Sequence, residues 1–380
     1  MLVAMAQVSG FLGQVAGVLI LVACPVLLGA QTLRPGETET DKRAVERTHR
    51  EEGEAILALA DNAMAGKPVP ADFDVQWQND FVKAQRGTFV PFTLTIDATA
   101  MSRPAALVYV RARRRPERPG DSRRRDRKDP ETESPAETSY PVDAIFPVEL
   151  DRSQGRTARV SRGFAVTPGE YDVFVVLRER VDPDGTKSRP RASVLRRALN
   201  VPDFWASEFT TSTIMVADRL TTLSEPVPSD QLPERPYVVG RNEITPAADR
   251  VFRRSEELIV VFLVYNPMVT TERLFDVKVE YHFFRKDGKD GKARSEPAGG
   301  GPAHSVARAG ERYFNHTEPQ RFNPALMGAA FDPSGGEPVL AGQVVPLGGF
   351  EEGEYRLELL VLDLLSGKSL SRDVLFTVQQ

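Results

Sequence analysis

Apolar and polar side chains alternate with a period of two along most of the chain beyond residue 72. One face of residues 90–96 carries Val90, Phe92, Leu94 and Ile96, with Thr93 and Thr95 on the other. Similar short segments recur at intervals of roughly ten residues, with turn-forming residues between them. Alternation of this kind is typical of β-strands with one buried face. The pattern therefore predicts a mostly β protein.

One phrase of the sequence occurs twice. Gly169-Glu170-Tyr171 opens an apolar segment, and Gly353-Glu354-Tyr355 opens a similar one 184 residues later. In Greek-key sandwiches a tyrosine at this place sends its hydroxyl back across a corner to the backbone, and a preceding glycine permits the tight turn. We therefore predict that Gly169, Tyr171, Gly353 and Tyr355 are structural. The repeat predicts two tandem Greek-key sandwiches of the immunoglobulin or fibronectin III type.

The predicted order of segments follows from changes in period and composition. Thr38 and Asp41 form a capping-box pattern, and the helix that they begin carries only a narrow apolar stripe, so we expect a solvated spacer. Residues 226–236 are rich in proline and residues 213–217 could form an edge strand, which favours a semi-rigid, partly ordered linker. We assign a signal segment (1–30), a charged spacer helix (31–70), a first sandwich (71–203), a linker (204–235) and a second sandwich (236–380).

The first 30 residues contain no charged side chain and include a long apolar stretch. Such a segment, ending in Gly29-Ala30, is typical of a secretory signal peptide. Three outcomes remain open: cleavage after Ala30, lipidation of Cys24 in a lipobox-like context, or an uncleaved anchor. Pro25 directly after Cys24 argues against lipidation. Cys24 is the only cysteine, so the rest of the chain has no disulfide, cysteine nucleophile or thiolate metal site.

The strongest local charge lies between residues 111 and 128, which hold ten basic and three acidic residues. Acidic residues follow directly, and the run contains no aromatic residue on which a base could stack. We predict a disordered insertion over residues 111–139, with polyanion binding as the alternative. The arginines that would carry such binding are Arg113, Arg114, Arg115, Arg123, Arg124 and Arg125. The net charge of −4 predicts no general affinity for nucleic acid.

No motif for catalysis, a cofactor or a metal rises above background. The Asp-Gly turns at residues 182–185 and 286–291 are expected to be hairpins, since neither continues as a calcium loop. His282 is expected on a solvent-exposed strand face, because residues 275–283 alternate strictly. Trp77 and Trp205 are expected in core or interdomain packing. An enzymatic role would need carboxylates that converge, for instance among Asp276, Glu351, Glu352 and Glu354.

Several stretches resemble a group of secreted proteins of environmental bacteria, notably acidobacteria. In some of these, similar modules follow a von Willebrand factor A domain or a GWxTD domain. The resemblance lies in residues 168–177, 201–204, 252–266 and 353–378. The motifs that define those neighbouring domains are absent here, so the resemblance implies an exported sandwich protein and no activity.

These observations favour a non-catalytic, exported interaction or structural module, periplasmic or extracellular, without a cofactor. The expected partner is another envelope or secreted protein. Contact with a membrane is expected only through an N-terminal lipid or an uncleaved anchor. The alternatives are a carbohydrate-processing or accessory protein, and polyanion binding through the arginine-rich insertion.

Overall fold

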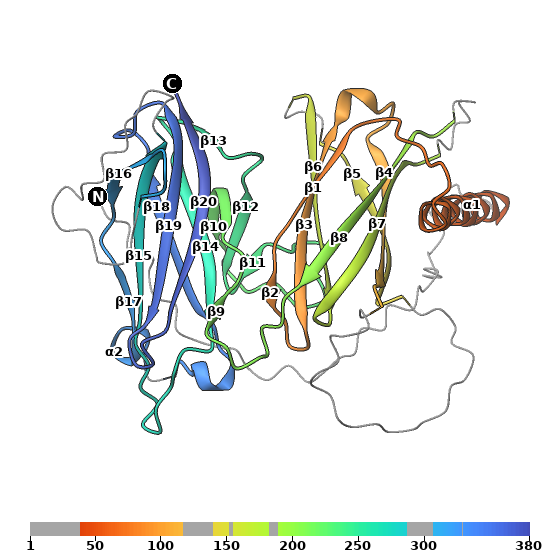
Figure 1. Cartoon of the computed structure of the whole chain (residues 1–380). Helices are drawn as coiled ribbons and strands as arrows, with labels where there is room; N and C mark the ends of the chain where they lie inside the picture. The colour runs from red at the N-terminus through yellow and green to blue at the C-terminus, as the bar shows by residue number, and fades with distance from the viewer. Residues whose placement is uncertain (1–38, 117–139, 152–154, 182–188, 287–306, 329) are drawn as a thin grey trace. The chain divides into compact units, whose positions relative to one another are not determined.

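The computed structural model describes residues 39–116, 140–151, 155–181, 189–286, 307–328 and 330–380 (Figure 1). These residues form two compact units. We call residues 39–79 and 84–203 the N-terminal unit, and residues 80–83 and 204–380 the C-terminal unit. Strands dominate both units, so the predicted mostly β class is confirmed.

The N-terminal unit has two antiparallel sheets. One sheet joins β1, β3 and β6, and the other has the order β5-β4-β7-β8. The elements are α1 (Glu39–Met64), β1 (Val75–Asn79), β3 (Thr88–Asp97), η1 (Ala98–Ala100), β4 (Ala105–Arg114), β5 (Val142–Glu149), β6 (Thr157–Val166), β7 (Gly169–Glu179) and β8 (Ala192–Val201).

The alternation in the sequence explains how these sheets bury a core. Val90, Phe92, Leu94 and Ile96 are all fully buried, as the period of two in β3 requires. Val108 and Val110 of β4 and Val173 and Val175 of β7 are also buried. Figure 1 shows the two sheets of this unit face to face.

The charged helix packs against the sheet, so the prediction of a solvated spacer is wrong for its C-terminal half. Ile56 and Ala60 are fully buried, and they contact Leu107, Tyr109 and Val176 on the outer face of the β5-β4-β7-β8 sheet. The apolar stripe is narrow, but a single stripe of small and aliphatic side chains is enough to cover one sheet face. Residues 111–114, assigned to the insertion, belong to β4.

The C-terminal unit also has two sheets. One has the order β11-β12-β10-β14-β18 with β9 beside β14, and the other has β13-β20-β19-β15-β16 with β17 beside β15. Its elements are β2 (Val82–Lys83), β9 (Thr210–Thr211), β10 (Met215–Thr222), β11 (Val238–Val239), β12 (Asn242–Pro246), β13 (Val251–Arg253), β14 (Glu257–Tyr265), β15 (Val277–Lys286), β16 (Glu311–His316), β17 (Gln320–Phe322), α2 (Pro324–Met327), η2 (Pro333–Gly335), β18 (Val339–Pro346), β19 (Gly353–Asp363) and β20 (Ser369–Gln379).

One hydrophobic core joins both sheets of this unit. Val260 and Phe262 of β14 belong to it together with Tyr281 of β15 and Leu359 of β19. The predicted linker contains two strands, β9 and β10. The possible edge strand at 213–217 overlaps β10, which is not an edge strand because it pairs with both β12 and β14. The prolines lie in the irregular segment after β10. The apolar residues before them, in β10, belong to the sheet that also contains β12 and β14.

Candidate interaction sites

The two repeated tyrosines occupy equivalent places in different sheets, at the second residue after the glycine that begins β7 or β19. The Tyr171 hydroxyl donates to the backbone oxygen of Thr167 at 2.9 Å. The Tyr355 hydroxyl donates to that of Glu351 at 2.8 Å. Each bond thus closes a corner of five residues, counted from the acceptor to the tyrosine. Both side chains are buried, so each hydrogen bond satisfies a hydroxyl that water does not reach.

An arginine fastens each corner from the neighbouring strand. Arg114 of β4 lies opposite Tyr171 and donates to the Pro168 oxygen at 3.2 Å. Arg285 of β15 lies opposite Tyr355 and donates to the Glu352 oxygen at 2.8 Å. Arg114, which we considered for polyanion binding, therefore has a structural contact. The repeat did not reveal these arginines, because they precede the two glycines by different numbers of residues.

The outer face of β15 is covered, so the expectation of a solvent-exposed His282 is wrong. Its side chain is buried and lies 3.2 Å from Glu280, measured from Nε2 to Oε2. Phe284, on the same face, is also buried. The alternation placed these residues on one face correctly, but long side chains of the neighbouring strands cover that face.

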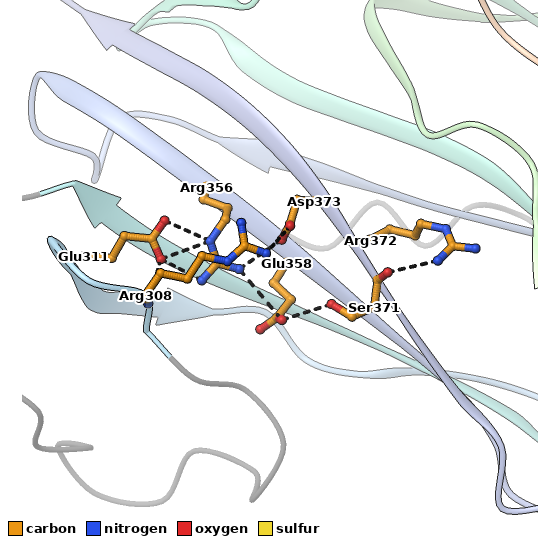
Figure 2. A network of polar contacts seen from close by, with 7 residues as sticks. All are labelled: Arg308, Glu311, Arg356, Glu358, Ser371, Arg372 and Asp373. Atoms are coloured by element: carbon orange, nitrogen blue, oxygen red, sulfur yellow. Dashed lines mark hydrogen bonds and ion pairs between the residues drawn. The ribbon is translucent and has the colours of Figure 1, made fainter.

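A buried arginine organises the polar side chains on the β15-β19-β20 face (Figure 2). Arg356 of β19 is 0% exposed and its guanidinium lies 4.2 Å from the ring centroid of Phe284. Its Nη2 donates to Glu311 at 2.7 Å, and its Nη1 donates to Asp373 at 2.9 Å. Glu358 lies at 3.7 Å from the same Nη1. We call these four charged residues the Arg356 centre.

Opposite charges hold the Arg356 centre ionised. Burial opposes the charge on Arg356, but hydrogen bonds to Glu311 and Asp373 outweigh it and raise the pKa of the guanidinium. Burial also favours neutral Glu311, but the contact with Arg356 prevails and lowers the pKa of that carboxyl. The centre is therefore a closed set of ion pairs whose main role is structural.

The equivalent position in the N-terminal unit carries the opposite charge. Asp172 is the third residue after Gly169, as Arg356 is after Gly353. Its side chain is 6% exposed and is surrounded by three arginines. Asp172 accepts from Arg115 at 2.7 Å and from Arg196 at 3.1 Å, and Arg113 lies at 3.6 Å. We call these residues the Asp172 centre. Hydrogen bonding from Arg115 is the main cause of a lowered pKa of Asp172.

Sequence reasoning found only part of the Asp172 centre. Arg113 and Arg115 stood out in the arginine-rich run, whereas Arg196 lies on β8 and no local pattern marked it. Antiparallel pairing of β7 with β8 brings Arg196 opposite Phe174, beside Asp172. Arg123, Arg124 and Arg125 lie outside the described residues, as do the predicted signal segment with Cys24, the turn at 182–185 and most of the turn at 286–291.

Three connections at one end of the C-terminal unit expose aliphatic side chains. These connections are the β14–β15 loop, the β17–α2 segment and the β19–β20 hairpin. Pairing of Val277 with both Asp363 and Phe322 brings them to the same end. The exposed side chains, between 39% and 51% accessible, are Met268, Leu274, Leu326, Leu364 and Leu365. We call this surface the apolar loop end.

Asp363 connects two of these segments. Its carboxylate accepts from the Met268 amide at 2.8 Å and from the Leu365 amide at 3.2 Å. The Leu364 amide donates to the Asp276 oxygen at 2.8 Å. These bonds hold the backbone of Met268, Leu364 and Leu365 in place, which lowers the backbone entropy lost when a partner binds.

Among the acidic residues considered for catalysis, Asp276 lies far from Glu351, Glu352 and Glu354. Asp276 precedes β15 and pairs with Arg321, whereas Glu354 pairs with Lys286 at the other end of β15. The nine residues between those ends correspond to about 30 Å of strand. Glu351 is exposed and contacts Arg285. Two acids that act on one glycosidic bond must lie far closer together.

A separate buried carboxyl lies at the start of the segment 80–83. Asp80 is 4% exposed, and burial raises its pKa to about 7 although Tyr237 and Arg250 act in the opposite direction. The Phe81 amide donates to Thr213 Oγ1 at 2.9 Å, and the Lys83 amide donates to the Tyr265 hydroxyl at 3.0 Å. Asp80 therefore belongs to the C-terminal unit although β1 and β3 flank it in sequence.

The tryptophans have different surroundings. Trp77 stacks on Phe92 with the ring centroids 4.2 Å apart. Trp205 is exposed, contrary to expectation, and the Lys83 ammonium lies 4.2 Å from the centroid of its ring. Within the described ranges, no cluster of three or more histidine, cysteine or acidic residues is arranged to hold a metal ion. In the same residues, no helix has the length and apolar character needed to span a membrane.

Comparison with known proteins adds little. No protein-family model and no curated protein matches the chain. Among solved structures, the chain is similar to trypsin-activated alpha-2-macroglobulin from Escherichia coli, with a TM-score of 0.21 and 10% identity over 82% of the chain. The chain is also similar to Salmonella alpha-2-macroglobulin reacted with methylamine, with a TM-score of 0.20 and 14% identity over 82% of the chain. The chain covers 17% of each of these proteins, and likeness this weak supports no inference about fold or activity.

Proposed function

We propose that this chain is an exported, non-catalytic interaction or structural module of the bacterial envelope. Its two units would be Greek-key sandwiches of the immunoglobulin or fibronectin III type, and its partner another envelope or secreted protein. The two tyrosine corners support this fold type, since such corners are a hallmark of Greek-key sandwiches.

The apolar loop end is the observation that carries the interaction role. Loops at the end of a sandwich commonly form its binding surface, as in variable domains. Here five aliphatic side chains project from such loops, and backbone hydrogen bonds fix two of the three segments. A group of exposed aliphatic side chains of this kind is typical of an interaction site.

Co-purification from envelope extracts tests this role. Leu274→Asp with Leu364→Asp places two charges on the loop end and leaves the core unchanged, because both side chains are exposed. Arg219→Asp, at an exposed position of β10, is the matched control. We expect a partner that is retained by the wild type and by the control and is lost with the double variant. Equal recovery with all three proteins would contradict the proposal.

Export is tested separately by mass spectrometry of the mature N-terminus. A protein that begins at Gln31 indicates ordinary cleavage, and one that begins at a lipid-bearing Cys24 indicates an anchored lipoprotein. A mature protein that begins at Met1 and fractionates with the cytoplasm would refute export.

The other two functions have less support. The acids of the carbohydrate-processing alternative are paired with basic residues at opposite ends of β15. Polyanion binding through residues 111–128 remains a prediction. It is tested by salt-dependent retention on heparin with and without residues 117–128, because residues 111–114 belong to β4.

A further inference from the structure

We propose that the Asp172 centre is a binding site for a tetrahedral oxyanion, a phosphate or sulfate group, on the folded face of the N-terminal unit. This inference does not rest on the proposed protein-binding role. It also differs from polyanion binding by the arginine-rich insertion, because it requires Arg196 of β8, about eighty residues downstream of Arg115.

The Asp172 centre has more hydrogen-bond donors than acceptors. Each guanidinium has five N–H donors, whereas one carboxylate offers about four acceptor positions. Asp172 accepts from Arg115 and Arg196 through the same oxygen, Oδ1, and its Oδ2 lies 3.6 Å from Arg113. Within the described ranges, most side-chain N–H groups of the three arginines are therefore left for other acceptors. Phosphate and sulfate oxygens match the guanidinium fork in geometry and charge.

The arginines of the Asp172 centre are accessible to solvent. The Asp172 side chain is 6% exposed, whereas those of Arg115, Arg113 and Arg196 are 37%, 42% and 59% exposed. The carboxylate thus forms the floor of the centre, and the guanidiniums reach solvent. Three arginines against Asp172 leave a surplus of positive charge, which Glu170 beside Arg115 only partly offsets.

The three guanidiniums are also held in place. Arg113 and Arg196 lie on paired strands, and Arg115 directly follows one. All three side chains contact the buried carboxylate of Asp172. Phe174 lies next to it on the same face, with the guanidinium carbons of Arg113 and Arg196 each 5.7 Å from its ring centroid. A ligand that binds here meets donors that are already ordered, so less side-chain entropy is lost on binding.

The Arg356 centre shows what a purely structural arrangement looks like at the same position. There the central arginine is fully buried, and three carboxylates, those of Glu311, Glu358 and Asp373, surround it. The cation lies inside the set, whereas Asp373 at its edge is 28% exposed and also pairs with Arg308. In the N-terminal unit the charges are reversed, and the excess donors are exposed. A structural centre does not require this exposed surplus, whereas an anion site does.

The test is calorimetric titration of the full chain with sodium phosphate and with sodium sulfate, at constant ionic strength in sodium chloride. Wild-type protein is compared with Arg196→Ala and with Arg197→Ala. Arg197 is the matched control, since it is the next residue on β8, is exposed, and has the same charge. Arg196→Ala leaves Asp172 paired with Arg113 and Arg115, and Arg196→Lys retains the charge if the alanine variant unfolds.

We expect saturable binding of phosphate or sulfate, weakened about tenfold by Arg196→Ala because one charge-assisted hydrogen-bond donor is lost. Arg197→Ala should leave the affinity within about twofold, and Arg196→Lys should be intermediate because the planar fork is lost. Retention on heparin distinguishes the source of the group. If free ions do not bind, loss of retention with Arg196→Ala but not with Arg197→Ala assigns the site to a sulfated polymer.

Two results would overturn the proposal. One is that neither free ions nor heparin bind to the wild-type protein. The other is that Arg196→Ala and Arg197→Ala weaken binding equally, which would indicate attraction by net charge alone.

Discussion

Replacing Asp80 with asparagine should remove a pH dependence of stability from the C-terminal unit. Burial raises the pKa of Asp80 from 3.8 to about 7. Between these values the folded state binds a proton that the unfolded state has released, so stability from this group is present at low pH and is lost as the pH rises through 7. Each unit of pKa shift corresponds to about 1.4 kcal/mol. Between pH 5 and pH 8 the free energy of unfolding of the wild type should therefore fall by about 2.5 kcal/mol through this carboxyl.

Urea unfolding at pH 5 and pH 8 measures the effect. Trp77→Phe leaves Trp205 as the only tryptophan, so fluorescence then reports on the C-terminal unit that contains Asp80. Asp80→Asn keeps a similar shape without the charge, so its free energy of unfolding should not fall in this way. Relative to the wild type, the variant should be more stable at pH 8 than at pH 5 by about 2.5 kcal/mol. Asp230→Asn, at an exposed position of the same unit, should show no such gain. Parallel pH profiles for wild type and Asp80→Asn would refute the reasoning.

Three further substitutions test the packing by urea unfolding. Arg356→Leu should cost about 3–5 kcal/mol, because it leaves buried carboxylates without their cation, whereas Arg219→Leu at an exposed position should cost little. Tyr171→Phe and Tyr355→Phe should each cost about 1 kcal/mol through the lost corner hydrogen bond, and no change in either would show that the bond is dispensable. Ala60→Asp should cost more than about 2 kcal/mol by placing a charge between α1 and the sheet, while Ala58→Asp on the exposed helix face should be nearly neutral.

The strands could be predicted from the sequence because each depends on a local period of two. Val90 to Ile96 on β3 show this, as do the two Gly-x-Tyr phrases that begin β7 and β19. Residues 213–217 were recognisable as a possible edge strand in the linker, but the structure pairs β10 on both sides, with β12 and β14 later in the chain. Strand pairing is a property of distant residues, so the linker's composition alone did not reveal it.

The polar sites were harder to predict for a similar reason. His282 follows the alternation of β15, yet side chains that reach over from other strands decide whether it meets solvent. Arg356 and Asp172 are single charged residues in apolar strands, and neither has a local motif. Their partners Glu311 and Arg196 lie on other strands, so only the fold brings each set together.

Photo-crosslinking in living cells tests the proposed role most directly. A photoreactive amino acid at position 274 lies on the apolar loop end, and one at position 219 lies at an exposed site away from it. We expect position 274 to form a discrete crosslinked complex with an envelope or secreted protein, and position 219 to form none. Identical crosslinking from both positions, or none from position 274 under native expression, would contradict the account.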